Sequence, residues 1–176
     1  CSDPFEVAEA EGWSEYIKTD LDRLAVKQGY KFDIHRAEHV CDFFETYLKH
    51  SKGQFAGQPF ILLDWQRYDL LYPLYGWVDS DGLRRYRKAT IFIGKKNGKT
   101  SLAAGLVLYG LVGEGERGAE VYSAAVDREQ AAICFREAAA MVRQSPKLQE
   151  DDDGTTLIKI VSNTKTLLVK DDGSFY

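Results

Sequence analysis

The segment from Lys88 to Ser101 carries the residues best suited to chemistry in this chain. It reads Lys-Ala-Thr-Ile-Phe-Ile-Gly-Lys-Lys-Asn-Gly-Lys-Thr-Ser. In a phosphate-binding loop, a glycine such as Gly98 lets the backbone approach the phosphates, a lysine such as Lys99 reaches the β- and γ-phosphate oxygens, and a hydroxyl such as that of Thr100 ligates Mg²⁺. A following helix directs its N-terminal N–H groups and its dipole at the same anion. The segment therefore predicts a site for a nucleotide with Mg²⁺.

The loop departs from the standard pattern at its first glycine. That pattern places a glycine five residues before the second one, where this chain has Ile93, and Gly94 comes one position late. A basic surface turn without a ligand is the alternative that the letters alone leave open. The flanking segments favour the nucleotide site, because the loop stands between a run of β-formers and an apolar, helix-like run, as the motif requires.

Strand and helix patterns alternate from the loop onward. Residues 119–124 form a short apolar run, Asp127 precedes a helical pattern that Pro146 ends, and a Ser-Asn-Thr-Lys turn separates two final strands. The expected elements are strands at 88–93, 119–124, 157–161 and 166–170 and helices at 102–111 and 127–144. This order predicts an α/β domain with a mainly parallel sheet, whose ligand lies at the carboxyl ends of the strands.

Helical patterns precede this α/β region. We expect helices within residues 1–30, with Leu21 and Leu24 on the apolar face, and further helices at 33–50 and 64–75. Asp64 is the expected N-cap of the last one. We divide the chain into an N-terminal helical segment, 1–56, and the first part of the α/β domain, 57–176.

Composition excludes several classes of protein. With 176 residues, 44% of them apolar, the chain has the size of one globular domain, and no apolar run reaches the length of a membrane span. The three cysteines, Cys1, Cys41 and Cys134, are too few and too far apart for a disulfide framework, so we expect reduced thiols.

Charge is distributed unevenly along the chain. The net charge is −4, but no acidic residue occurs between Gly82 and Gly113. The basic residues of that stretch are Arg84, Arg85, Arg87, Lys88, Lys95, Lys96 and Lys99. Such a positive field suits a polyanionic ligand, whereas a solvated basic face is the plainer alternative.

Other groups of polar residues favour plainer interpretations. His35, Glu38 and His39 fit a zinc-protease motif, but charged residues on the exposed face of an amphipathic helix explain the same letters. The acidic runs at 151–153 and 171–172 precede glycines and are typical of solvated turns. Upstream of the loop, the amide of Gln66 is able to read an adenine edge, with Trp65 packing on a base. As the plainer alternative, a tryptophan is more often a core residue and a glutamine more often a surface residue.

Three segments together resemble the large subunit of tailed-phage terminases, the motors that package viral DNA. Residues 57–67 (Gly-Gln-Pro-Phe-Ile-Leu-Leu-Asp-Trp-Gln-Arg) resemble the adenine-side segment of that family, residues 94–100 resemble its Walker A loop, which also lacks the usual first glycine, and residues 122–131 resemble its next strand and helix start. The resemblance implies that Lys99 and Lys95 are catalytic, although Lys95 stands where the family commonly has an arginine and lacks the bidentate fork of arginine. It implies that ATP and Mg²⁺ are bound by Trp65, Gln66, Gly94, Lys96, Asn97, Gly98, Lys99, Thr100 and Ser101, with Thr100 as the metal ligand.

The resemblance also implies an architecture and a setting. The fold would be a RecA-like P-loop NTPase of the additional-strand type, incomplete in this chain because the Walker B strand and a nuclease domain should follow Tyr176. The implied partners are double-stranded viral DNA, the portal protein, the small terminase subunit and further copies of the chain in a ring, with no membrane, in the cytoplasm of the bacterial host. We expect this chain alone to hydrolyse ATP negligibly.

Three other functional hypotheses fit the same residues. A helicase-like remodeller would continue into a second RecA-like lobe instead of a nuclease domain. A nucleic-acid-binding module would show salt-dependent DNA binding that ATP does not affect. An interaction domain with a basic turn would bind no nucleotide.

Overall fold

The computed structural model describes residues 3–150, 154, 156–170 and 172–176. The chain forms two compact units, each described by itself below. Unit 1 comprises residues 1–41 and 62–91, and unit 2 comprises residues 42–61 and 92–176. Within the described residues, no helix combines the length and the apolar character needed to cross a membrane.

Unit 1 is built from short helices and one small sheet. Its elements are α1 (Pro4–Ala10), η1 (Ser14–Tyr16), α2 (Asp20–Lys27), β1 (Lys31–Phe32), the first half of α3 (Ile34–Tyr47), the π-helix η3 (Trp65–Leu71), α4 (Tyr72–Gly76) and β2 (Trp77–Val78). Strands β1 and β2 pair antiparallel, with Lys31 opposite Val78. The expected helices are confirmed in all three regions, although residues 1–30 form separate short helices. Asp64 stands at the N-cap position of η3, as expected, but its side chain makes no capping hydrogen bond.

The buried face of α2 differs from the expected one. Leu21 and Leu24 are 67% and 51% exposed, whereas Asp22, Ala25 and Val26 are buried. Thr19 and Asp22 form a capping box, in which each side chain bonds the backbone of the other. Because Asp22 also binds Arg85 across unit 1, the side of α2 that carries Asp22 faces inward.

Arg85 is a structural residue of unit 1. Its Nη1 donates to Asp22 Oδ1 at 2.7 Å and its Nη2 to the Leu21 carbonyl at 2.9 Å, and the guanidinium lies over the rings of Trp77 and Tyr86. Arg84 likewise lies over the Tyr75 ring. The sequence interpretation assigned both arginines to a positive field for a ligand, and the structure uses them for packing and pairing instead.

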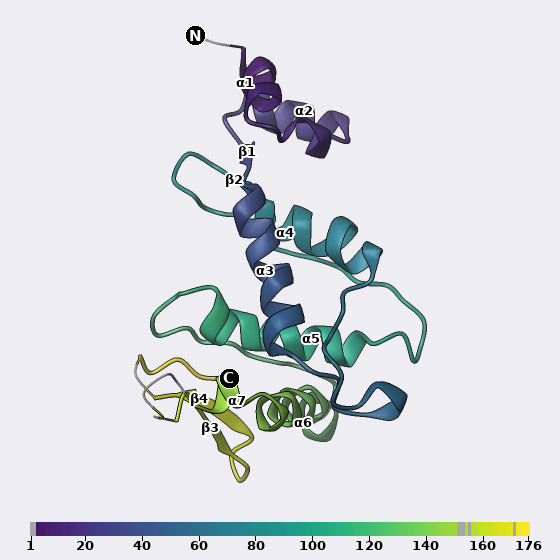
Figure 1. The fold of residues 1–176 in the computed structure, drawn as a ribbon, viewed down its shortest axis with the longest axis vertical. Helices are drawn as coiled ribbons and strands as arrows, with labels where there is room; N and C mark the ends of the chain where they lie inside the picture. The colour runs from purple at the N-terminus through teal and green to yellow at the C-terminus, as the bar shows by residue number, and fades with distance from the viewer. Residues whose placement is uncertain (1–2, 151–153, 155, 171) are drawn as a thin grey trace. The chain divides into compact units, whose positions relative to one another are not determined.

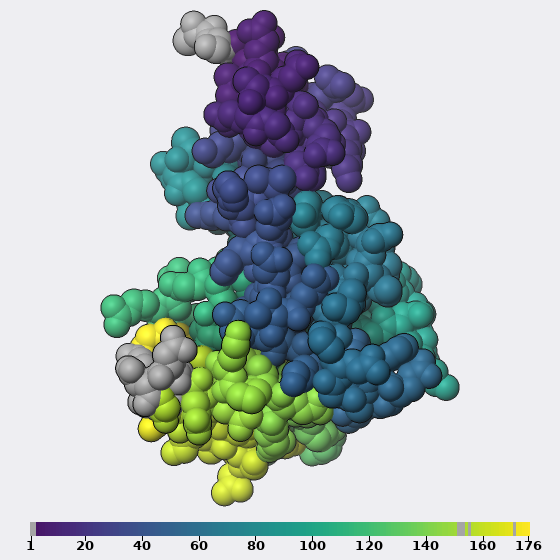
Figure 2. All heavy atoms as spheres, viewed as in Figure 1, coloured from purple at the N-terminus to yellow at the C-terminus, as the bar shows by residue number. Residues whose placement is uncertain are grey.

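Unit 2 contains the longer helices. Its elements are the second half of α3, η2 (Gly53–Phe55), α5 (Lys99–Leu108), the π-helix η4 (Tyr109–Gly113), α6 (Arg128–Gln144), α7 (Pro146–Gln149), β3 (Ile158–Val161) and β4 (Thr166–Val169) (Figure 1). Asp127 caps α6 by accepting from the Gln130 N–H at 2.8 Å, as expected. The predicted hairpin is confirmed, because β3 and β4 pair antiparallel. In the space-filling view, α6, α7 and the hairpin pack as one continuous mass (Figure 2).

The predicted parallel sheet is absent from the described residues. Neither 88–93 nor 119–124 forms a strand, and the only parallel pairing is the isolated bridge between Glu120 and Phe175. Both sheets that do form are two-stranded and antiparallel. Phe92, in the first segment, is 100% exposed, and Val126, just after the second segment, is 97% exposed. A strand needs a hydrogen-bonded ladder along its length and a covered face. Residues 119–121 share backbone hydrogen bonds with Phe175 at a single bridge, and Phe92 is left uncovered, so neither segment forms a full strand.

Close packing fixes α5 within unit 2. A side chain at Gly105 would overlap the Phe44 ring and would place its Cβ 2.9 Å from Leu48 Cδ1. The helix backbone therefore touches the end of α3 and the residue that follows it. Phe44, Leu48, Leu102 and Leu108 are all no more than 1% exposed, so this contact belongs to the core of the unit.

Gly105→Ala is expected to destabilise unit 2 by about 1–3 kcal/mol, because the added methyl group overpacks a filled core. Urea denaturation followed by circular dichroism measures the change. Gly110→Ala is the matched control, because its Cβ would lie 3.5 Å from Val121 Cγ2, an ordinary contact distance. Equal stability of the two variants would contradict the packing argument.

Asp22→Asn is expected to destabilise unit 1 by about 3 kcal/mol at neutral pH, because it leaves the largely buried Arg85 without a carboxylate. Burial raises the pKa of Asp22, but hydrogen bonds from Thr19 and Arg85 outweigh burial and hold the pKa below its ordinary 3.8. Because the folded-state pKa is depressed, this stabilisation is present above the unfolded-state pKa and is lost as pH falls through the folded-state pKa.

The difference in stability between wild type and Asp22→Asn should therefore shrink between about pH 5 and about pH 2, as urea denaturation at several pH values would show. Asp20→Asn, on the exposed side of the same first turn, is the control and should change little. A difference that stays constant over this range would refute the ion-pair argument.

Candidate phosphate-binding site

The loop before α5 has the backbone shape of an anion-binding turn. Gly98 is the N-cap of α5 and lies in the left-handed region with φ 75°, a conformation that other residues adopt at a cost of about 1 kcal/mol. Lys96 is also left-handed, with φ 68°. Alternation of right- and left-handed residues turns successive N–H groups toward one side, and the first N–H groups of a helix have no intrahelical acceptor. The turn can therefore present several donors to one anion.

Lys99 closes the loop with its side chain. Its Nζ donates to the Ile93 carbonyl at 2.7 Å, so the ammonium group spans from the first residue of α5 back to the residue before the loop. The bond is exposed and its acceptor is uncharged. A phosphate oxygen is a stronger acceptor for an ammonium group than a neutral carbonyl, so a bound polyphosphate would compete well for Lys99.

The remaining loop residues are open to solvent. Gly94, Lys95, Lys96, Asn97 and Thr100 are all exposed. A Cβ at Gly94 would lie 3.1 Å from Asn97 Nδ2, so the loop folds back on itself at this point. The structure thus brings together every predicted residue from Gly94 to Ser101 in one turn. Its glycines, lysines and hydroxyl groups fit a nucleotide triphosphate with a divalent cation.

Ser101 points its hydroxyl group toward α6 and not along the loop. It donates to Glu137 Oε1 at 2.9 Å, and the same oxygen accepts from Ser51 Oγ at 2.6 Å. Lys52 Nζ lies 3.6 Å from the other carboxylate oxygen. Glu137 is 5% exposed, so a buried carboxylate connects the first turn of α5, the middle of α6 and the segment after α3.

Gln66 and Trp65 belong to unit 1, whereas the loop belongs to unit 2. Gln66 is buried, with 4% of its surface exposed, and its Oε1 accepts from the Leu63 N–H at 2.9 Å. Trp65 is half-buried. The side chain of Gln66 is thus held in a fixed orientation by the segment that precedes η3.

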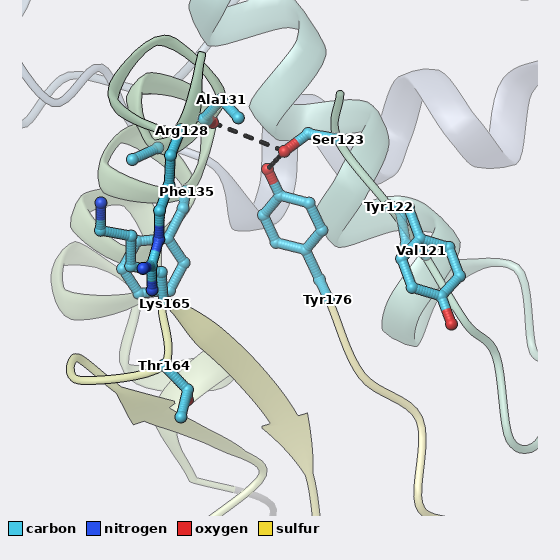
Figure 3. A pocket seen from close by; sticks show the side chains of 10 residues that line it. Val121, Tyr122, Ser123, Arg128, Ala131, Phe135, Thr164, Lys165 and Tyr176 are labelled. Atoms are coloured by element: carbon cyan, nitrogen blue, oxygen red, sulfur yellow. Dashed lines mark hydrogen bonds between the residues drawn. The ribbon is translucent and has the colours of Figure 1, made fainter. Parts of the chain in front are cut away.

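A separate pocket of about 220 Å³ lies at the start of α6 (Figure 3). Tyr176 donates to Ser123 Oγ at 2.8 Å on one side, and Arg128 and Lys165 line the other. Burial raises the pKa of Tyr176 well above its ordinary value, so its hydroxyl stays protonated. None of the sequence-predicted site residues lines this pocket.

The histidine motif on α3 keeps the surface position expected of it. His35, Glu38 and His39 lie on the exposed side of α3, as the plainer interpretation predicted. Across the described part of the chain, no group of three or more His, Cys, Asp or Glu residues could hold a metal ion. The acidic residues 151–153 and 171 lie outside the described residues, and Asp172 accepts from the Ser174 N–H in a turn. Within the described residues, neither Cys41 nor Cys134 forms a disulfide, and Cys1 lies outside them.

Sequence reasoning missed Glu137. The residue lies three positions after Cys134 and four before Met141, so it interrupts the apolar stripe that was expected on α6. A charged residue within such a stripe is almost never buried unless it has partners, and that irregularity was a usable signal. Its partners, Ser51 and Ser101, lie 86 and 36 residues away in the chain, so spacing could not have identified them.

Comparisons with known proteins point to one family. The family model described as "Terminase large subunit, ATPase domain" matches residues 64–171. The protein "Terminase, large subunit" of Enterobacteria phage HK97 is 40% identical over 116 residues, which are 65% of this chain and 22% of that protein. The crystal structure of the HK97 bacteriophage large terminase is similar with a TM-score of 0.66 and 34% identity, over 80% of this chain and 26% of that one. The chain thus spans about a quarter of the length of these relatives.

Proposed function

The chain belongs to the family of terminase large subunit ATPase domains, and we propose that it forms the ATP-binding part of a motor that packages viral DNA. Family membership implies ATP binding and, in the whole protein, ATP hydrolysis. The observation that carries the proposal is the geometry of the loop: Gly98 turns the backbone into α5, and Lys99 spans the loop with an ammonium group that a phosphate could capture.

Each loop residue has a proposed task. Lys99 would neutralise the β- and γ-phosphates, and the backbone from Gly94 to Gly98 would donate to phosphate oxygens. Thr100, exposed at the start of α5, would hold Mg²⁺, which supplies positive charge for phosphoryl transfer. Lys95 would sense the γ-phosphate as a point charge, since lysine lacks the planar fork of arginine.

The adenine end of the nucleotide would be read by Gln66. Its Oε1 is held by the Leu63 N–H, which fixes the plane of the amide and would leave its NH₂ group to donate to the base. Trp65 would pack beside it. In this proposal residues 57–176 form the first part of the ATPase domain and residues 1–56 precede it as a helical segment.

The whole protein would supply the rest of the fold. Strands beyond this chain would pair with 88–93 and 119–124, cover Phe92 and Val126, and complete a mainly parallel, RecA-like sheet of the additional-strand type. A glutamate from one of those strands would orient the attacking water, and a nuclease domain would follow. This chain alone would then hydrolyse ATP negligibly.

The proposed setting is that of a packaging motor. Hydrolysis would drive double-stranded DNA through a ring of subunits at the portal protein, with the small terminase subunit as a partner, in the cytoplasm of the bacterial host. The identity of 40% with the HK97 terminase supports this setting.

Lys99→Ala in the full-length protein is expected to lower steady-state ATP turnover about a hundredfold, because it removes the cation that faces the transferred phosphoryl group. The measurement is phosphate release at saturating Mg-ATP, with and without DNA. Lys159→Ala changes an exposed lysine of β3 and is the matched control, with turnover expected to equal wild type.

Equal ATP turnover in Lys99→Ala and wild type would contradict the ATPase proposal. Strongly salt-dependent DNA binding that Mg-ATP leaves unchanged would instead favour the phosphate-binding module, in which the loop grips the nucleic-acid backbone.

A further inference from the structure

Glu137 is a buried charge that the proposed reaction does not use. Its carboxylate is 5% exposed in the middle of α6, among residues such as Ala138 and Met141 that are fully buried. A buried carboxylate is costly unless hydrogen bonds satisfy its oxygens. The hydrogen-bond partners of Glu137 therefore indicate its role in the fold.

Two hydroxyl groups converge on one oxygen of this carboxylate. Ser51 Oγ lies 2.6 Å and Ser101 Oγ 2.9 Å from Glu137 Oε1. An ionised carboxylate only accepts, so both serines donate. Hydrogen bonds to a charged acceptor are about twice as strong as neutral ones. Lys52 Nζ lies 3.6 Å from Oε2 and supplies a positive charge, although its side chain is 76% exposed.

The bond from Ser101 fixes the part of α5 that would touch phosphate. Ser101 is the third residue of the helix, directly after Lys99 and Thr100. One turn further on, Gly105 packs against Phe44 and sets the distance of the helix from α3. Leu102, next to Ser101, is buried in the core. The Ser101–Glu137 bond adds a polar attachment to this apolar packing, in the turn that carries Lys99 and Thr100.

We infer that Glu137 is a positioning residue for the phosphate-binding turn: through Ser101 it holds the first turn of α5 so that Lys99 and Thr100 face a bound nucleotide. Through Ser51 it ties the same turn to the segment after α3. The inference rests on the proposed ATP-binding function. Glu137 touches no nucleotide in this scheme and reaches the first turn of α5 through Ser101.

The test is a double-mutant cycle of Glu137→Gln and Ser101→Ala in the full-length protein. Each single variant is expected to raise the Kd for Mg-ATP about fivefold to tenfold, measured by calorimetry, because the first turn loses its charged anchor. The double variant should lose no more than the worse single variant, because both changes break one bond. Ser101→Thr, which keeps the hydroxyl group, should bind within about twofold of wild type.

A second readout separates positioning from general stability. Amide hydrogen exchange of residues 99–104 in the nucleotide-free protein should accelerate in Glu137→Gln and in Ser101→Ala. Glu129→Gln is the matched control on α6, because Glu129 is exposed and pairs with Lys165 at 3.1 Å and with Arg136 at 3.4 Å. It should change neither Kd nor exchange in 99–104.

The outcomes distinguish this inference from the proposed function. Additive effects in the cycle, or unchanged exchange in both single variants, would overturn the positioning role even where Lys99→Ala abolishes Mg-ATP binding. Unchanged Mg-ATP affinity in Lys99→Ala would overturn the proposed function itself, and the positioning role with it.

Discussion

The position of the phosphate loop depends on how closely α5 can approach the end of α3. Gly105 offers no side chain at the point where the helix meets Phe44, and the Phe44 ring occupies the space that a Cβ would need. A helix held this tightly has a defined axis, so the residues at its N-terminus have a defined direction. Gly98 then turns the chain into the loop, and Lys99 reaches back to Ile93. Packing inside the unit thus sets the geometry of a site that lies at its surface.

Some charged side chains of this protein stabilise the fold, and others are exposed where they could meet a ligand. Arg85 lies near the basic loop in sequence, yet it is committed to Asp22 in unit 1. Glu137 lies far from the loop in sequence, yet its carboxylate meets the third residue of α5. Among the described residues, the loop lysine Lys99 bonds only to the Ile93 backbone carbonyl, an uncharged acceptor. Sequence neighbourhood is therefore a poor guide to which charges face a ligand here, and burial is a better one.

The sequence correctly predicted the features that depend on interactions between residues close together in the chain. The cap at Asp127, the end of α6 before Pro146 and the β3–β4 hairpin depend on residues a few positions apart, and all three are confirmed. The strands at 88–93 and 119–124 were wrong for this structure because pairing depends on distant neighbours, as the exposure of Phe92 shows. Glu137 escaped prediction for the same reason, since its meaning comes from Ser51 and Ser101. The loop could be recognised from the sequence because the glycine, lysine and hydroxyl residues that define it are consecutive.

The aromatic core of unit 1 has a practical consequence. All three tryptophans, Trp13, Trp65 and Trp77, belong to unit 1, where Trp13 and Trp77 meet edge to face with ring centroids 6.2 Å apart. Unit 2, which carries the loop, has none. Intrinsic tryptophan fluorescence of this chain therefore reports on unit 1 alone. A single tryptophan introduced at the exposed Phe92, just ahead of the loop, would give unit 2 an optical signal of its own.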